Sequence, residues 1–261
     1  MRERLAAAAD IARRAGEVLL RHYGHVAGEH KGDQTLVTIA DREAERLVRS
    51  ELGRRFPDDC VIGEEFGRSG TDPDARAWYV DPLDGTTNFV YGLPLWGVSL
   101  GLLDHGRAAV GAIHYPLLRE TYYGAEGLGA WRNDEPLRPW PGREPFRTND
   151  PVMVPTEMVA EGLQFGVPVR VRTVGSAALQ FAFVASGAAR CGLWRGDYGW
   201  DLAGGLAICR AAGVQVLTTA GAEPDWSVLV SGQPMPWDLC AAPADTMPLL
   251  LAALRQSGVR G

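Results

Sequence analysis

The sequence has few of the features that mark several common classes of protein. Lys31 is the only lysine among 261 residues, and no apolar run approaches the roughly 20 residues that a membrane-spanning helix requires. The N-terminal residues lack the apolar core of a signal peptide. A net charge of −6 disfavours nucleic acid as a partner. These absences predict a soluble, cytoplasmic protein that acts on a small molecule and has no role at membranes.

Motifs of several familiar cofactor and nucleophile sites are missing or out of context. The four cysteines include no C-x-x-C pair and the five histidines no H-E-x-x-H pair, which disfavours zinc and redox sites. No Walker glycine loop precedes Lys31. Residues 97–101 match the G-x-S-x-G pattern of serine hydrolases, but the residues around Ser99 are typical of a strand that enters a hairpin. A serine esterase built on Ser99 is therefore a weak alternative.

The composition predicts a folded chain with a large core. A 46% share of hydrophobic residues is ordinary for a globular enzyme of this length. Hairpins alternate with strand–helix pairs, which is typical of layered sheets covered by helices. The proline-rich stretch 136–145 predicts a seam between an N-terminal α+β half, 1–138, and a C-terminal α/β half, 139–261.

Apolar spacing predicts the individual elements. The predicted helices are 3–22, 41–56, 176–187, 200–212 and 244–256. The predicted strands are 60–64, 77–81, 96–103, 108–115, 120–124, 128–132, 152–155, 169–173, 190–194, 214–217, 227–230 and 238–241. The residues Asp104-His105-Gly106 predict a tight hairpin between two of these strands.

Residues 81–89, Asp-Pro-Leu-Asp-Gly-Thr-Thr-Asn-Phe, carry the strongest chemical signal in the chain. The apolar run before them predicts that Asp81 ends a buried strand. A proline fixes φ between the two carboxylates, and a Gly-Thr pair follows Asp84, which indicates a built turn. Carboxylates at the end of a buried strand commonly hold a hard divalent cation. A turn without a metal is the alternative, because Asp-Pro-x-Asp-Gly also favours turns.

Three further acids occur where a shared site would need them. Glu64 follows the short apolar run 60–62, Asp201 begins a helix with a small-residue face, and Asp41 opens the second helix. An acid at a helix N-terminus is also an ordinary cap. Asp238 lies in a second Trp-Asp-Leu segment, but an apolar strand follows it, so we interpret it as a turn acid. The acids indicate a site only in combination.

Four segments together resemble the inositol monophosphatase family, within the metal-dependent, lithium-sensitive sugar phosphatases. They are Gly63-Glu64-Glu65, the segment 81–89, Val174-Gly175-Ser176-Ala177-Ala178 and Trp200-Asp201-Leu202-Ala203-Gly204. They follow the family order with family-like spacing over nearly the whole chain. The resemblance implies an α/β fold of the α+β kind, a layered α-β-α-β-α sandwich, a phosphatase activity and a homodimer.

The resemblance also implies a site with two Mg²⁺ ions. Glu64, Asp81 and the backbone carbonyl of Leu83 would hold one ion. Asp81 would bridge to a second ion, which Asp84 and Asp201 would complete. A third, looser ion would lie near Glu64 through waters, and Glu64 also belongs to the implied catalytic set.

Catalytic and substrate-binding positions follow from the same resemblance. Asp41 and Thr86 would orient and deprotonate the attacking water. The amides of Gly85 and Thr86 would cradle the phosphate. The implied substrate contacts also include a segment just before a helix: Gly175, Ser176 and Ala177.

Elementary chemistry agrees with this interpretation. Two divalent ions about 3.5–4 Å apart can stabilise both the entering and the leaving oxygen of an in-line displacement. Water on such an ion is acidified toward neutrality, so no histidine base is needed. No nucleophilic side chain lies among the acids, which predicts direct attack by water without a phosphoenzyme. A non-catalytic protein that uses the cleft only for binding is the alternative from another class.

The resemblance is weakest on the substrate side. Six residues before Trp200 the family usually has a glutamate that bonds an inositol hydroxyl, and here that position is Trp194, which cannot accept such a bond. Asp197 or Arg195 could replace the glutamate, or Arg195 could meet a second anionic group of the substrate. Trp194 and Trp96 are candidates for the lining of the substrate mouth.

Two other segments bear on the substrate and on assembly. The stretch 139–170 is shorter than in typical relatives, which affects the rim of the pocket and the implied dimer interface. Residues 91–96 resemble the related histidinol-phosphate phosphatases. An inositol-like polyol monophosphate therefore ranks first as the predicted substrate, and histidinol phosphate ranks second.

Overall fold

The computed structural model describes residues 1–25, 29–30, 36–70 and 76–256 of the chain. Its helices are α1 (Arg2–His22), α2 (Ile39–Arg55), α3 (Thr86–Val90), α4 (Thr156–Ala160), α5 (Ala177–Ala185), α6 (Gly199–Ala212), α7 (Met247–Gln256) and the 3₁₀ helix η1 (Trp226–Ser231). Its strands are β1 (Glu29–His30), β2 (Leu36–Val37), β3 (Cys60–Gly63), β4 (Gly67–Ser69), β5 (Arg76–Asp84), β6 (Gly97–Asp104), β7 (Arg107–Tyr115), β8 (Glu120–Ala125), β9 (Gly129–Arg132), β10 (Glu135–Pro136), β11 (Pro151–Met153), β12 (Arg170–Arg172), β13 (Cys191–Trp194), β14 (Val214–Thr218) and β15 (Leu239–Pro243).

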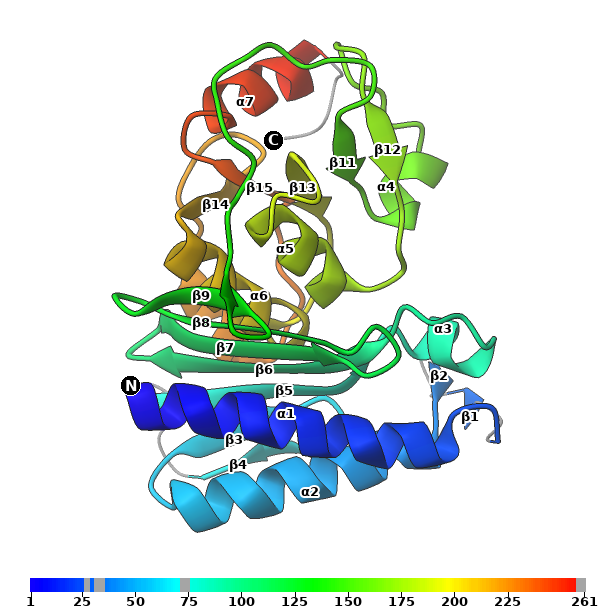
Figure 1. Ribbon diagram of the computed structural model, residues 1–261, viewed down its shortest axis with the longest axis vertical. Coiled ribbons are helices and arrows are strands. Elements are labelled where there is room, and N and C mark those ends of the chain that lie inside the picture. The colour runs from blue at the N-terminus through cyan, green and yellow to red at the C-terminus, as the bar shows by residue number, and fades with distance from the viewer. Residues whose placement is uncertain (26–28, 31–35, 71–75, 257–261) are drawn as a thin grey trace.

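These elements stack in five layers (Figure 1). Helices α1 and α2 lie on one face of an eight-stranded sheet, and α5 and α6 lie between its other face and a five-stranded sheet. Helix α7 lies beyond the five-stranded sheet at the far end of the molecule. This α-β-α-β-α order confirms the predicted fold class and layered sandwich.

The eight-stranded sheet has the order β10-β9-β8-β7-β6-β5-β3-β4. Its neighbours are antiparallel except β3 and β5, which run parallel. The predicted hairpin joins β6 to β7, where His105 and Gly106 adopt positive φ. Because parallel strands end at the same edge of a sheet, the residues after β3 and at the end of β5 lie next to each other.

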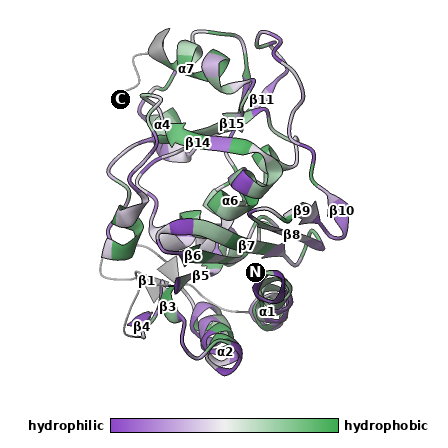
Figure 2. Cartoon of the chain, turned by 90° about the vertical axis from the view of Figure 1, so that its left-hand side faces the viewer, coloured by the Kyte–Doolittle hydropathy of each residue, from purple (hydrophilic) through white to green (hydrophobic). Residues whose placement is uncertain are grey.

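The outer helices pack on this sheet through small and branched side chains. The buried face of α1 includes Ala8, Ala12 and Ala15, which allow the helix to approach the strands closely. Figure 2 views α1 and α2 almost end-on beneath the sheet. The inner face of α2 differs, because it buries two acids, Asp41 and Glu45, beside its apolar residues.

Helix α6 touches the eight-stranded sheet backbone to backbone. A Cβ atom at Gly101 would lie 2.4 Å from the amide nitrogen of Gly204, and one at Gly111 would lie 2.1 Å from the Gly204 carbonyl oxygen. Larger residues at these positions are therefore excluded without a shift of the helix. Ser99 lies fully buried on β6 at the same contact. Its strand runs on into the β6–β7 hairpin, so the serine-esterase alternative has no structural support.

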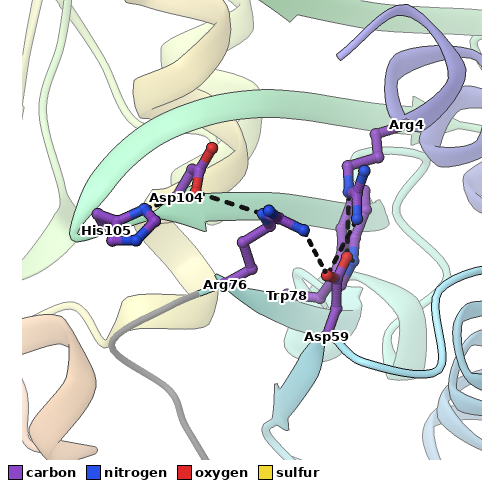
Figure 3. A network of polar contacts seen from close by, with 6 residues as sticks. All are labelled: Arg4, Asp59, Arg76, Trp78, Asp104 and His105. Atoms are coloured by element: carbon purple, nitrogen blue, oxygen red, sulfur yellow. Dashed lines mark hydrogen bonds and ion pairs between the residues drawn. The ribbon is translucent and has the colours of Figure 1, made fainter.

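A polar network at the amino-terminal end of α1 fastens that helix to the sheet (Figure 3). Asp59 accepts two hydrogen bonds from Arg4, at 3.0 and 3.1 Å, and one from Nε1 of Trp78 at 3.0 Å. Arg76 extends the network from Asp59 to Asp104 at the end of β6. The side chain of Asp59 is only 2% exposed, so a charge buried before β3 holds α1 and β5 together.

Several details differ from the predicted elements. The predicted strand 227–230 is wrong, because residues 226–231 form the 3₁₀ helix η1, whose start is capped by Asp225 accepting from the Ser227 amide. The short elements β1, β2, β4, α3, α4 and β10 were not predicted. The chain passes from one large sheet to the other between β10 and β11; the domain boundary itself stays a prediction. No helix in the described ranges is long and apolar enough to cross a membrane.

Candidate active site

The parallel ends of β3 and β5 form the base of the candidate site. Gly63 pairs with Val80, and the Glu64 amide donates to the Val80 carbonyl at 3.1 Å. Glu64 and Asp81 therefore follow matched positions on neighbouring strands. Strand β5 continues beyond the predicted end at Asp81, and an irregularity in its pairing with β6 lies between Asp81 and Asp84. Both aspartates therefore lie in the last four residues of β5, on either side of the irregularity.

Asp41 enters the site from the first turn of α2. Thr38 caps the helix by accepting from the Ala40 amide at 3.1 Å, and its own amide and hydroxyl donate to Oδ2 of Asp41 at 2.9 and 2.5 Å. The other oxygen, Oδ1, lies 3.5 Å from the Thr86 hydroxyl, which donates to the Leu83 carbonyl at 3.0 Å. The residues proposed to handle the water, Asp41 and Thr86, thus lie together beside that carbonyl.

Asp84 connects the two halves of the molecule. Its Oδ2 accepts from the Tyr115 hydroxyl at 2.7 Å and from the Ser176 hydroxyl, and its Oδ1 accepts from the Ala177 amide at 3.0 Å. Ser176 also caps α5 by accepting from the Leu179 amide at 3.1 Å. Ser176 and Ala177, two of the predicted substrate contacts, therefore bind Asp84 in this structure.

Two glycines let the loops of the two halves approach each other. Gly85 has a φ of +87°, and a Cβ atom there would lie 2.8 Å from the Leu95 carbonyl and 3.3 Å from the Gly175 carbonyl. Nδ2 of Asn88 donates to the carbonyls of Leu95 and Val174 at 2.7 and 2.8 Å. The predicted segment 175–177 is thus held against the 81–89 segment.

Asp201 enters from the first turn of α6, where its Oδ2 accepts from the Tyr198 amide at 2.6 Å. Burial raises the pKa of Asp201 well above its ordinary value, and the negative charges of Asp197 and Glu64 raise it further. Asp84 adds to the same effect. These interactions bring Asp201 into one electrostatic cluster with the residues at the ends of β3 and β5.

The carboxylates at the strand ends perturb one another in the same way. Burial raises the pKa of Asp81 well above its ordinary value, and the charges of Glu64, Asp84 and Asp201 raise it further. Burial also raises the pKa of Asp84, although the Ser176 hydroxyl opposes the shift. Negative charge in this cluster of acids is therefore costly without a cation.

Asp41 shares part of this environment. Burial raises its pKa to about 7, against the hydrogen bonds from Thr38 that lower it, and the charges of Glu65 and Glu64 contribute to the increase. An aspartate with a pKa near neutrality can exchange a proton at physiological pH, which is the property that a general base needs.

The donor set fits a hard divalent cation, since all its candidate ligand atoms are oxygens. The oxygens are nevertheless engaged with protein donors: Oδ1 of Asp81 accepts from the Leu83 amide at 3.0 Å, and Asp84 and Asp201 are bonded as above. Among the described residues, no three His, Cys, Asp or Glu side chains form a ready metal-binding group. A cation at this site would therefore draw the carboxylates closer together.

Comparison with known proteins identifies the family. The model of the inositol monophosphatase family matches residues 1–257. The chain belongs to the inositol monophosphatase family. Members of this family are phosphoric monoester hydrolases and are generally metal-dependent. The family resemblance that four short segments indicated is thereby confirmed, as is the classification of the chain as a phosphatase.

The relatives of this inositol monophosphatase family member are named for different phosphatase activities. A fructose-1,6-bisphosphatase/inositol-1-monophosphatase of Thermotoga maritima is 35% identical over 227 residues, covering 85% of this chain and 87% of the relative. A histidinol-phosphatase of Chlorobaculum parvum is 39% identical over 133 residues, covering 50% and 51%. The solved structure of a Thermotoga maritima IMPase has a TM-score of 0.82 and 29% identity, covering 98% of each chain.

Within this family framework, the predicted role of the tryptophans at the substrate mouth is wrong. Trp194 is 1% exposed and stacks on Phe181 with ring centroids 3.8 Å apart, and its Nε1 donates to the Ala177 carbonyl at 3.1 Å. Trp96 is fully buried against Phe89. Both indoles pack in the core because large apolar rings gain most free energy there.

The structure also corrects the role considered for Arg195. Its guanidinium makes two bonds to Asp238, at 2.7 and 2.5 Å, and also contacts Glu161. The positive charge is therefore already balanced by two carboxylates. The interpretation of Asp238 as a turn acid omitted this function, since the two partners are 43 positions apart in the sequence.

Asp197 is the substrate-side candidate whose charge interacts with the acids of the cluster. Burial raises its pKa to about 7, and the charges of Asp84 and Glu157 contribute to the increase. Its Oδ2 is covered from solvent and has no hydrogen-bond partner in the part of the chain that the structure describes. An acid thus stands beside the site in this family member, three residues after the position where a glutamate is usual.

Sequence reasoning missed Glu45, which holds the turn that presents Glu64. The carboxylate of Glu45 accepts from the amides of Glu65 and Phe66 at 2.7 and 3.3 Å and from Nε of Arg49 at 2.7 Å. A Cβ atom at Gly63 would lie 2.1 Å from Oε1 of Glu45, so the glycine makes room for the acid. The spacing of Asp41 and Glu45 by one helical turn was the signal that could have revealed this face.

Proposed function

We propose that this chain is a Mg²⁺-dependent phosphomonoesterase that hydrolyses a small polyol monophosphate of the inositol monophosphate kind by direct attack of water. The observation that carries the proposal is a cluster of four acids, Glu64, Asp81, Asp84 and Asp201, in which neighbouring negative charges raise the pKa of Asp81 and of Asp201. Its members come from β3, β5 and α6 of a chain in a phosphatase family. Acids brought together at such a cost are the ligands that hard cations prefer.

The residues that would hold Mg²⁺ are those of this cluster. Glu64, Asp81 and the Leu83 carbonyl are proposed for one ion, and Asp81, Asp84 and Asp201 for a second. A third ion near Glu64 is also part of the proposal. Bound Mg²⁺ supplies Lewis acidity toward the phosphate and lowers the pKa of bound water.

The protein itself would position the water and accept its proton. Oδ2 of Asp41 is engaged by Thr38, so Oδ1, which faces the Thr86 hydroxyl at 3.5 Å, is the atom left to accept a proton. Thr86 fixes this geometry through its bond to the Leu83 carbonyl. The amides of Gly85 and Thr86 at the start of α3 remain the proposed phosphate contacts.

The substrate proposal favours one phosphate over two. A second phosphate would need a cation on the substrate side, and Arg195 is already bound by Glu161 and Asp238. Hydroxyl groups of a polyol can instead donate to carboxylates, and Asp197 offers one beside the cluster. A homodimer in the cytoplasm remains part of the proposal.

Histidinol phosphate is the second candidate, and one observation favours it. Asp197 and Glu157 place negative charge together on the substrate side, and such charge attracts an ammonium or imidazolium group. A histidinol-phosphatase is among the relatives, although it aligns with only half of the chain.

A substrate panel tests the proposal. Phosphate release would be measured with inositol 1-phosphate, histidinol phosphate, fructose 1,6-bisphosphate and adenosine 3′,5′-bisphosphate, each with Mg²⁺ and with excess chelator. We expect the highest kcat/KM with inositol 1-phosphate and no turnover with chelator. Full activity in the chelator would contradict the metal mechanism, and a preference for histidinol phosphate would select the second candidate.

A further inference from the structure

We propose that Tyr115 is a positioning residue of the metal site, which holds Asp84 ready to bind a divalent cation. The inference rests on the proposed function, because it requires a cation at Asp84. Tyr115 is the last residue of β7 and is completely buried. In the sequence it looks like an ordinary core residue at the end of an apolar strand, and none of the recognised family segments contains it.

The Tyr115 hydroxyl lies in a compact triangle with Asp84 and Ser176. It is 2.7 Å from Oδ2 of Asp84 and 2.8 Å from Oγ of Ser176, and Oγ also contacts the same Oδ2. Each hydroxyl has one proton, so two of the three contacts can be hydrogen bonds at one time. In either arrangement Oδ2 of Asp84 accepts at least one bond from a neutral donor.

The ring of Tyr115 is fixed by its surroundings. A Cβ atom at Gly97 on the neighbouring strand β6 would lie 2.8 Å from Cδ1 of the ring. Glycine at this position therefore provides the space that the ring fills. A buried ring in such a closely packed niche delivers its hydroxyl to one point, which is what a positioning role requires.

The bonding of Asp84 differs between its two oxygens. A carboxylate offers about four acceptor positions. Oδ2 is directed at the two hydroxyls, while Oδ1 accepts from the Ala177 amide at 3.0 Å, with the Ala178 amide at 3.5 Å. The Ala178 contact is longer than an ordinary N–H···O hydrogen bond. Asp84 is therefore anchored through Oδ2, and a cation bound through Oδ1 would replace this weak contact. Groups that orient a metal ligand in this way typically contribute about 10–100-fold to metal affinity.

Mg²⁺ titration of Tyr115→Phe tests this role without any substrate. The variant keeps the ring in its niche and removes only the hydroxyl. Calorimetric titration of chelator-treated protein should show that the affinity for at least one Mg²⁺ ion falls by about tenfold or more. Tyr122→Phe is the matched control, because Tyr122 is a buried tyrosine of the adjacent strand β8 whose hydroxyl donates to Glu120, outside the site. Its Mg²⁺ affinity should equal that of the wild type.

A double-variant comparison separates positioning from a general structural effect. In the Asp84→Asn background, Tyr115→Phe should change the remaining Mg²⁺ affinity by less than a factor of two, since its effect passes through Asp84. A further tenfold loss in that background would overturn the inference. If Tyr115→Phe does not fold, Ser176→Ala replaces it in the same comparison, with the same expected result.

The outcomes also distinguish the inference from the proposed function. A wild-type protein that binds no Mg²⁺ would overturn both. Wild-type binding with unchanged affinity in Tyr115→Phe would overturn the positioning role alone and leave the phosphatase proposal intact.

Discussion

Asp41 combines two roles at the scale of a single residue. One oxygen completes the cap of α2 with Thr38, and the other faces Thr86 in the candidate site. Because the cap fixes the side chain, the free oxygen cannot rotate away. The start of α2 would thereby orient the proposed general base.

The raised pKa of Asp41 gives a pH dependence with a definite sign. Between the ordinary value of 3.8 and about 7, the folded protein keeps a proton that the unfolded chain has lost. The free energy of unfolding of the metal-free protein should therefore fall as the pH rises through this window. Urea unfolding with chelator at pH 5 and pH 8 should show a smaller fall for Asp41→Asn than for the wild type. Equal falls would show that Asp41 does not contribute.

With Mg²⁺ present, Asp41→Asn should also lower kcat by about 10²–10⁴-fold.

Glu45 provides a second prediction at this scale. Glu45→Ala removes the acceptor for the Glu65 and Phe66 amides and loosens the turn that carries Glu64. We expect kcat/KM with Mg²⁺ to fall by about 10–100-fold, measured as phosphate release. Glu51→Ala is the control, because Glu51 lies on the same helix and pairs with Arg14 of α1 and with Arg54 and Arg55 of α2. Equal activity of the two variants would contradict a role for Glu45.

The sequence indicated the acids of the site but not the residues that hold them. Asp81, Asp84 and Asp201 stand in short segments whose pattern is recognisable by itself. Glu45 and Tyr115 act through partners 20 and 31 residues away, so their roles appear only when the fold brings the partners together. Trp194 was misjudged because an aromatic residue gives no sequence signal for whether it faces a pocket or the core.

At the scale of elements, the polar network around Asp59 should matter for stability and not for catalysis. Asp59→Ala leaves the buried Nε1 of Trp78 and the Arg4 guanidinium without their acceptor. We expect the free energy of unfolding to fall by about 1–3 kcal/mol, as measured by denaturant unfolding, with kcat unchanged. Asp104→Ala, which removes the more exposed end of the network, should cost about 0–1 kcal/mol. A similar cost for both would mean that the burial of Asp59 is unimportant.

Long elements with a clear period were predictable from the sequence, and short ones were not. The helices that became α1 and α2 carry apolar stripes, and α6 is a long apolar segment that is buried on nearly every side. Residues 226–231 are apolar and β-prone enough to favour a strand, but only tertiary pairing could have made one, and Asp225 instead starts a 3₁₀ turn. Elements such as β4 and β10 exist because a neighbouring strand offers hydrogen bonds, which the sequence of one segment does not reveal.

At the scale of the whole molecule, cation binding should stabilise the fold. Four acids contributed by β3, β5 and α6 repel one another, so a bound cation favours the folded state. At a Mg²⁺ concentration of about 100 Kd, binding contributes about 2.7 kcal/mol, which should raise Tm by roughly 5–10 °C for a chain of this size. Thermal unfolding should show this rise for the wild type and little rise for Asp81→Asn. An equal rise in NaCl of the same ionic strength would indicate charge screening instead of specific binding.

The five-layer architecture followed from the family resemblance more than from local pattern. Alternating strands and helices indicated layered sheets, but they left open which helices lie between the sheets and which lie outside. The parallel pair β3–β5 within an otherwise antiparallel sheet decides the position of the site, and no feature of either strand alone specifies that pairing.

The backbone contact between α6 and the eight-stranded sheet determines which substitutions can change the geometry of the candidate active site. Where Gly101 and Gly111 meet Gly204, main chain lies against main chain, and none of these three residues has a side chain whose rotamer could change the gap. The backbone contact thus fixes the distance between the first turn of α6 and the ends of the strands. After a substitution elsewhere in the core, side chains can repack without changing this distance. One methyl group added at the glycine contact would instead displace the whole helix and Asp201 with it.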